Sequence, residues 1–193
     1  MSSPDKPKSP RDAALKVAQE LCDVLKPVTD RLIVAGSLRR RKLMVGDVEI
    51  LFVPKVSSVQ TGLFETDRET VDHAAKELDR LLASGVIAKR RNVHGSEMWG
   101  AKNRLAVHVA SGIPVDLFAT TSPNWWNYLV CRTGNAKNNI VICNAAIARG
   151  WTWNPYGAGF TDAAGVIHPV ASERDVFDMV GLSYLEPWER NLK

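Results

Sequence analysis

The chain has 193 residues, of which 45% are hydrophobic and 24% are charged, and it carries a formal net charge of +4. This length supports one domain or two small ones, and no apolar run approaches the ~20 residues that a membrane-spanning helix needs. Three cysteines without metal-type spacing (Cys22, Cys131 and Cys143) indicate free thiols in a reducing compartment, so we expect an intracellular protein.

Hydrophobic periodicity and turn residues predict a mixture of helices and strands. The first ten residues are polar and rich in Pro, which is typical of a disordered tail. Ser9 is the expected N-cap of a first helix, with Pro10 at the first helical position. The expected elements are, in chain order, this helix up to residue 26, strands over 31–35 and 47–53, a loop at Gly62, a helix from Thr66 or Asp67 to Leu82, a strand over 86–92, a connector over 95–103, and strands over 104–110 and 114–119.

The character of the chain changes near residue 122. A short helix is expected from Ser122 and a longer one from residue 135 or 136 to 149, followed by strands over 151–153 and 166–168 with a glycine-rich loop between them. Ser172 and Asp175 have the spacing of a capping box, which predicts a last helix to Val180. Residues 125–193 hold six basic and six acidic residues, so the whole positive excess lies before them.

The most informative motif joins a Gly-Ser turn to two carboxylates. Gly36 and Ser37 end one expected strand and begin a helical turn, where free backbone N–H groups can bind phosphate oxygens. Asp47 and Glu49 follow on the next strand and point to the same face, because side chains alternate along a strand. Neighbouring carboxylates repel one another unless a cation lies between them, and Mg²⁺ suits carboxylate and phosphate oxygens. This combination indicates phosphoryl or nucleotidyl transfer.

A third carboxylate, Asp116, lies within the apolar strand expected over 114–119. By itself it would suggest a paired core aspartate. Beside the Asp47–Glu49 strand it becomes the expected third metal ligand.

These motifs resemble the nucleotidyltransferase superfamily, and the rest of the chain resembles the family X DNA polymerases, the DNA polymerase beta group. The resemblance rests on the ordered segments LVCRTG (129–134), Asn138-Asn139, ERDVFD (173–178) and YLEP (184–187), and it extends from about Arg11 to the C-terminus. It implies an α+β fold with a disordered tail over residues 1–10, a nucleotidyltransferase palm over 11–121 and a small α/β thumb over 122–193.

The resemblance also implies a division of roles among the site residues. Asp47, Glu49 and Asp116 would be the catalytic residues and would hold two Mg²⁺ ions, for which Mn²⁺ can substitute. The expected nucleotide-binding residues are Gly36, Ser37, Arg40, Gly46, Cys131, Arg132, Gly134 and Asn139. The expected nucleic-acid-binding residues are Arg39, Arg41, Lys42, Lys89, Arg90, Arg91, Lys102 and Arg104, although residues 89–91 also fit an ordinary solvated surface.

Several positions depart from the family pattern. Glu49 stands where the family usually has Asp, and Cys131-Arg132 replaces the Tyr-Phe pair that contacts the incoming sugar. Cys143 replaces an arginine of the thumb, and the short N-terminal segment leaves no room for the lyase and DNA-gripping domains of larger members. The resemblance is therefore to a minimal palm–thumb enzyme of the kind that some viruses carry.

The expected function is metal-dependent transfer of a nucleotide from a nucleoside triphosphate to a 3′-hydroxyl, during template-directed DNA synthesis in short gaps. Alternatives are transfer with little or no template use to DNA, RNA or another acceptor, a non-catalytic nucleic-acid-binding module, and small-molecule adenylylation. The expected partners are gapped or primer–template DNA and a nucleoside triphosphate, with no membrane. We expect a cytoplasmic monomer, with the nucleoid or a viral replication site as possible locations.

Overall fold

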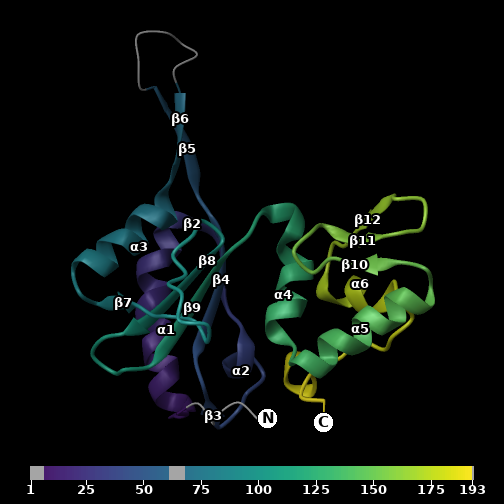
Figure 1. Ribbon diagram of the computed structural model, residues 1–193, viewed down its shortest axis with the longest axis horizontal. Helices are drawn as coiled ribbons and strands as arrows, with labels where there is room; N and C mark the ends of the chain where they lie inside the picture. The colour runs from purple at the N-terminus through teal and green to yellow at the C-terminus, as the bar shows by residue number, and fades with distance from the viewer. Residues whose placement is uncertain (1–6, 61–67, 193) are drawn as a thin grey trace.

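The structure is a computed structural model that describes residues 7–60 and 68–192. Figure 1 shows a mixed sheet with its helices on one side and a smaller, mostly helical part on the other side. The α+β architecture expected from the sequence is therefore confirmed. Among the described residues, no helix combines the length and apolar character needed to cross a bilayer.

The larger part is built on a five-stranded sheet in the order β2-β4-β9-β8-β7. Strands β4 and β9 run parallel, and the other neighbouring pairs are antiparallel. The strands are β2 (Thr29–Val34), β4 (Val48–Pro54), β7 (Ile87–Lys89), β8 (Asn103–His108) and β9 (Pro114–Ala119).

One face of this sheet is covered by α1 (Arg11–Leu25) and α3 (His73–Ala83). The residues that α1 buries recur at helical spacing, and they pack against the side chains of β4 and β9 that point to this face, among them Ile50 and Leu117. Because side chains alternate along a strand, Glu49 and Asp116 point to the opposite face.

The opposite face packs against α4 (Trp125–Thr133), which directly follows the 3-10 helix η2 (Ser122–Asn124). Leu51 of β4 and Phe118 of β9 form a buried cluster with Trp125, Tyr128 and Leu129 of α4. This cluster brings the second part of the chain onto the face that carries the two carboxylates.

The second part has a core of its own, which includes Val130, Ile142, Phe160 and Phe177. The fully buried Asn127 connects α4 to the segment around β10 (Thr152–Trp153). Its side-chain amide donates to the Asn154 carbonyl at 2.6 Å and accepts from Trp153 Nε1 at 2.6 Å. The elements of this second part are α4, α5 (Ala136–Ala148), β10, β11 (Gly159–Thr161), β12 (Ile167–Pro169), α6 (Glu173–Asp178) and η3 (Pro187–Glu189).

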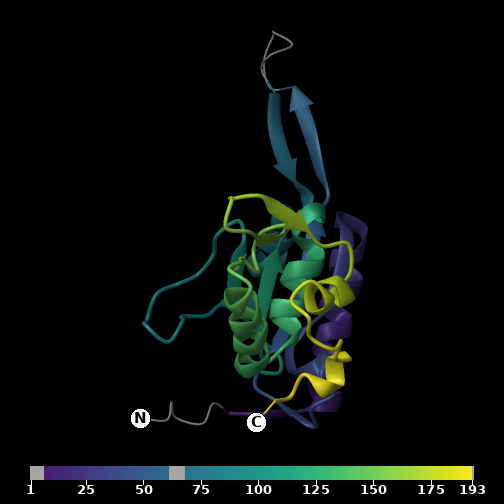
Figure 2. The same ribbon diagram turned by 90° about the vertical axis from the view of Figure 1, so that its right-hand side faces the viewer.

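The helix expected from Thr66 or Asp67 begins later than the sequence suggested. Those two residues and the loop position Gly62 lie outside the described residues, but β6 (Arg68–Asp72) is a strand that pairs with β5 (Val56–Gln60). The two strands form a hairpin that projects from the body in Figures 1 and 2. The correction follows from two signals that we missed, the β-branched pair at 70–71 and Asp72, whose side chain caps α3 by accepting from Ala75 N at 2.8 Å.

The start of the chain also differs from expectation. Ser9 and Pro10 form the short strand β1, which pairs with β3 (Met44–Val45), so neither belongs to a disordered tail. Helix α1 begins at Arg11, with Pro10 at its N-cap and without a capping side chain. Residues 1–6 lie outside the described residues. Smaller differences are that β7 covers only part of 86–92 and that α6 ends at Asp178 instead of Val180.

Candidate active site

A single row of side chains across four strands of the sheet forms the floor of the site. Glu49 of β4 and Asp116 of β9 are direct register partners, and Asp116 in turn pairs with Leu105 of β8. Arg90 follows β7 at the next position of the same row, where the Arg90 N–H donates to the Leu105 carbonyl at 2.9 Å. Asp47 lies immediately before β4, so the chain brings three carboxylates to one end of the central strands.

The three carboxylates influence each other electrostatically. Burial raises the pKa of Glu49 to about 8, and the negative charges of Asp47 and Asp116 act in the same direction. Arg132 and Arg40 are close enough to oppose this shift. A proton or a nearby cation would therefore stabilise Glu49 at neutral pH.

The donor chemistry of this cluster suits a hard divalent cation, although the side chains are not arranged as a finished metal site. Among the described residues, no three carboxylate, imidazole or thiolate groups converge as metal ligands. Instead, Arg90 Nη2 forms an ion pair with Asp116 Oδ1. A protein guanidinium thus lies against the carboxylate that we expected to bind metal.

The Gly-Ser turn lies directly over Glu49. It opens α2 (Gly36–Arg39), and Gly36 has a φ of +58°, a conformation that favours glycine. A Cβ at Gly36 would lie 2.7 Å from the Glu49 carboxyl, whereas one at Gly46 would meet nothing within 4 Å. The buried Ser37 hydroxyl has no hydrogen-bond partner in the part of the chain that the structure describes. An unpaired buried hydroxyl beside the carboxylates fits a role in holding a polar ligand such as a phosphate.

The three arginines that follow the turn are all engaged by the second part of the chain. Arg39 donates to both Glu173 oxygens, at 2.8 and 2.6 Å, and to Thr133 Oγ1. Arg40 donates to the Thr133 carbonyl at 2.6 Å and to Asn191 Oδ1 at 3.0 Å. The Arg41 guanidinium lies 3.9 Å from the centre of a tryptophan ring, that of Trp188.

We expected Arg39 and Arg41 to contact nucleic acid and Arg40 to contact a nucleotide. In this conformation all three join α2 to the second part of the chain. Burial lowers the pKa of Arg40, while Glu49 and Asp47 raise it, so the Arg40 guanidinium also lies within reach of the carboxylate charges.

The nucleotide-binding residues expected on the second part lie around the end of α4. Asn139 donates to the Cys131 carbonyl at 2.9 Å, and burial raises the pKa of the Cys131 thiol. Gly134 is closely packed, because a Cβ there would lie 2.5 Å from Asn138 Nδ2. The Arg132 guanidinium stacks 3.7 Å from the centre of the Phe118 ring, and Phe118 is two residues beyond Asp116 on the same strand. The structure thus brings Arg132 to the carboxylates but leaves Asn139 bonded to its own part of the chain.

The remaining basic residues do not form one continuous patch. Lys42 and Arg91 are exposed, and Lys89 lies 3.9 Å from Glu97. Arg104 is buried, with 6% of its surface exposed, so the structure does not present it as the surface cation that we expected. Its place is set by strand alternation, which turns Arg104 away from the Asp116 face.

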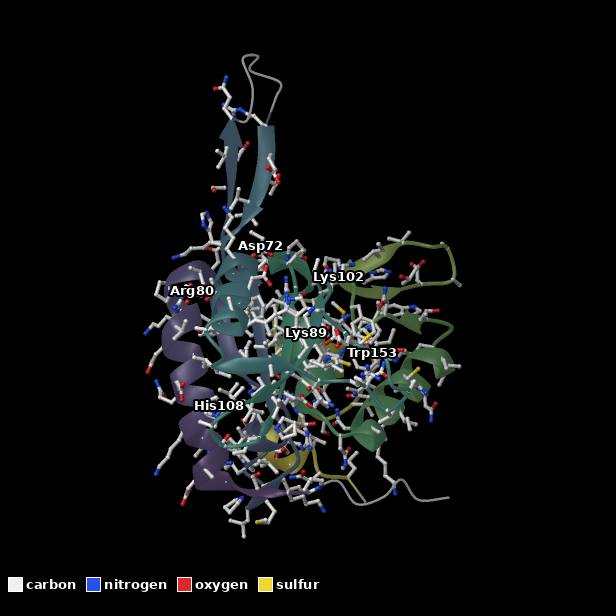
Figure 3. All side chains as sticks on the ribbon, turned by 60° about the vertical axis from the view of Figure 1, so that its left-hand side comes forward. Asp72, Arg80, Lys89, Lys102, His108 and Trp153 are labelled. Atoms are coloured by element: carbon white, nitrogen blue, oxygen red, sulfur yellow. The ribbon has the colours of Figure 1, made fainter. Side chains whose placement is uncertain are left out.

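Lys102 lies elsewhere, beside the base of the projecting hairpin, where Figure 3 shows it near Asp72. Both residues line a cavity of about 590 Å³ that also reaches Tyr128, Arg132 and Tyr156. This cavity therefore opens beside the stacked Arg132, on the side of α4 that faces the hairpin.

Two charged residues that hold the site together were missed as site residues. Glu173 accepts from Arg39 and also from Arg190 Nη1 at 2.7 Å, and Arg190 is fully buried. Glu173 belongs to a segment that already carried the family resemblance, and an acidic residue just inside a capped helix was the available signal. No local pattern marks Arg190.

Comparison with known families matches part of the chain. Residues 128–191 match the family described as the DNA polymerase beta thumb. A comparison with curated proteins gave no match. The matched range begins within α4 and ends at Asn191, so it covers the part of the chain that supplies Arg132, Thr133, Glu173 and Asn191 to the site. This part of the chain is thus similar to a polymerase thumb, as the sequence resemblance implied.

Proposed function

We propose that this protein is a metal-dependent nucleotidyltransferase that adds nucleotides to a DNA 3′-hydroxyl, most simply while filling short gaps. The observation that carries the proposal is the pairing of Glu49 with Asp116 on adjacent parallel strands, beside Asp47 and under the Ser37 turn. The likeness of residues 128–191 to a DNA polymerase beta thumb supports it, because this segment packs on the face that carries Glu49 and Asp116. In this proposal residues 11–121 are the palm and 122–193 the thumb.

Each group has a role that follows from its position. Asp47, Glu49 and Asp116 would hold two Mg²⁺ ions, which would activate the 3′-hydroxyl and neutralise the charge of the triphosphate. The Ser37 hydroxyl, which is buried without a partner among the described residues, would donate to a phosphate oxygen. Arg40 would exchange its carbonyl and Asn191 contacts for the triphosphate, because a phosphate is a stronger partner for a guanidinium than a neutral carbonyl.

A second candidate is transfer with little use of a template. The surface of α5 next to Asn139 presents the exposed side chains of Ile140 and Val141, and Cys143 is half-buried. None of these groups makes the strong hydrogen bonds with which a base pair can be checked. A further alternative is a non-catalytic module that only binds nucleic acid.

One assay separates these functions. A labelled primer on a one-nucleotide gap is incubated with Mg²⁺ and each dNTP and rNTP supplied singly. We expect addition of the complementary dNTP only. Addition regardless of the template would support the second candidate, and the rNTP reactions would show what Cys131 and Arg132 permit at the sugar.

Variants test the assignment of the carboxylates. Asp47→Asn and Asp116→Asn are expected to abolish addition, with circular dichroism spectra that match the parent protein. Asp30→Asn is a matched control, because Asp30 is an exposed aspartate on the outer strand β2. Full turnover by either site variant would overturn the assignment, and no addition by the parent protein with any metal or nucleotide would favour the binding module.

A further inference from the structure

Arg90 occupies an unusual place for a residue that follows an edge strand. β7 is the outermost strand of the sheet, and the Arg90 side chain crosses β8 to reach Asp116 on β9. Across the sheet, the row runs from the carboxylates of Glu49 and Asp116 through Leu105 to the Arg90 guanidinium.

The ion pair that results competes directly with a metal ion. When a carboxylate oxygen accepts a hydrogen bond from a guanidinium, its negative charge is partly neutralised and one of its lone pairs is occupied. Asp116 can then bind a divalent cation fully only after Arg90 Nη2 leaves its Oδ1 atom.

Arg90 is held more loosely than Arg39 and Arg190, the two arginines that bind Glu173. Besides Asp116 it makes one long side-chain contact, from Nε to the Ala106 carbonyl at 3.4 Å, and 23% of its side chain is exposed. Arg190, by contrast, is fully buried, and Arg39 donates to a carboxylate twice and to a hydroxyl once.

The surroundings also offer Arg90 a different anion. Its exposed neighbours in the chain are Lys89, which lies 3.9 Å from Glu97, and Arg91, so residues 89–91 keep a positive charge that attracts polyanions. A DNA phosphate that approaches this edge provides a fully charged oxygen to replace Asp116, so the guanidinium need not be left unpaired.

We propose that Arg90 is a mobile positioning residue that holds Asp116 in the absence of metal and transfers to a DNA phosphate when a primer binds. DNA binding and metal binding are coupled through this one side chain, so each strengthens the other. This inference rests on the proposed function, since it takes Asp116 as a metal ligand.

The test measures Mn²⁺ binding from the electron paramagnetic resonance signal of the free ion, without nucleotide. Each protein is titrated alone and with a saturating primer–template whose primer ends in a dideoxynucleotide. The proteins are the parent chain, Arg90→Met, Asp116→Asn and Arg91→Met. Arg91→Met removes the same charge from the next residue, which is exposed, and so controls for the general effect of net charge.

Without DNA, we expect Arg90→Met to bind Mn²⁺ at least ~10-fold more tightly than the parent, which corresponds to ~1.4 kcal/mol. Arg91→Met should stay within about twofold of the parent, since it loses only a screened long-range interaction. DNA should tighten Mn²⁺ binding by the parent at least ~5-fold, a typical coupling between sites, and by Arg90→Met less than about twofold.

Unchanged or weaker Mn²⁺ binding by Arg90→Met would overturn the inference and make Arg90 a fixed support for Asp116. Equal DNA coupling in Arg90→Met and the parent would overturn it as well. If Arg90→Met does not fold by circular dichroism, Arg90→Gln takes its place in the same comparison.

Asp116→Asn separates this inference from the proposed function. Parent-like Mn²⁺ binding by Asp116→Asn would remove the metal assignment, and the Arg90 inference with it. Weak binding by Asp116→Asn together with no gain in Arg90→Met would overturn the Arg90 inference alone.

Discussion

Replacing Glu173 by Ala should destabilise the fold strongly, because this carboxylate joins two arginines across the two parts of the chain. Glu173 accepts from Arg39 of α2, in the larger part of the chain, and from Arg190 near the C-terminus. Only 9% of its side chain is exposed, against 17% for Arg39 and 0% for Arg190. The substitution leaves both guanidinium groups without their shared partner.

The expected loss is about 3–5 kcal/mol, the usual result of removing one partner from a buried ion pair. In urea unfolding at pH 7, followed by tryptophan fluorescence, this loss would lower the midpoint by about 2 M for a slope of ~2 kcal/mol/M. The fully buried Arg190 accounts for most of it, since its charge would lose a compensating anion in a site that water does not reach.

The effect should depend on pH with a defined sign. Burial by itself raises the pKa of Glu173, but the hydrogen bonds from Arg39 and the charge of Arg190 outweigh it, and the pKa is lowered overall. A carboxyl group with a lowered pKa stabilises the fold above its ordinary pKa, and this stabilisation disappears as the pH falls through the lowered value. The parent and Glu173→Ala should therefore become similar in stability at acid pH.

Glu77→Ala is a matched control for this experiment. Glu77 pairs with Arg80 on the surface of α3, where 61% of the Arg80 side chain is exposed, so its midpoint should hardly change. A Glu173→Ala midpoint no lower than that of Glu77→Ala would refute the reasoning. The double variant Glu173→Ala/Arg190→Met should recover stability relative to Glu173→Ala, because it removes the buried charge as well.

Three further predictions concern the site and the thumb core. Because the pKa of Glu49 is raised from its ordinary value of 4.5 to about 8, its contribution to stability is full below pH 4.5 and is lost as the pH rises to 8. In EDTA, Glu49→Gln should therefore be more stable than the parent in urea at pH 8 and equally stable below pH 4.5, and equal stability at both values would contradict this. Gly36→Ala strains a φ of +58° and crowds Glu49, so it should lower the free energy of unfolding in urea by about 1–3 kcal/mol and weaken Mn²⁺ binding. Gly46→Ala, where the added Cβ meets nothing within 4 Å, should change neither the stability nor Mn²⁺ binding. Trp153→Phe leaves the buried Asn127 oxygen without its 2.6 Å donor and should cost about 1–3 kcal/mol in urea; a smaller loss would mean that another donor replaces it.

Local patterns in the sequence determined most of the elements and the carboxylate cluster. Strand β9 covers the expected residues 114–119, and α5 begins at Ala136, one of the two expected positions. Alternation along β4 correctly predicted that Val48 and Ile50 are buried and that Glu49 points to the other face. These features depend on neighbours within a few residues, and such neighbours are visible in a sequence.

Contacts between distant residues were decided only by the tertiary structure. Arg39 follows the Gly-Ser turn and was expected to contact nucleic acid, yet it pairs with Glu173, 134 positions away. Arg90 was expected to contact nucleic acid as well, and the sheet register brings it to Asp116. The physical reason is that a long cationic side chain has many possible anionic partners of similar strength. Packing of the strands, and of the two parts of the chain against each other, selects among them, and no local periodicity records that choice.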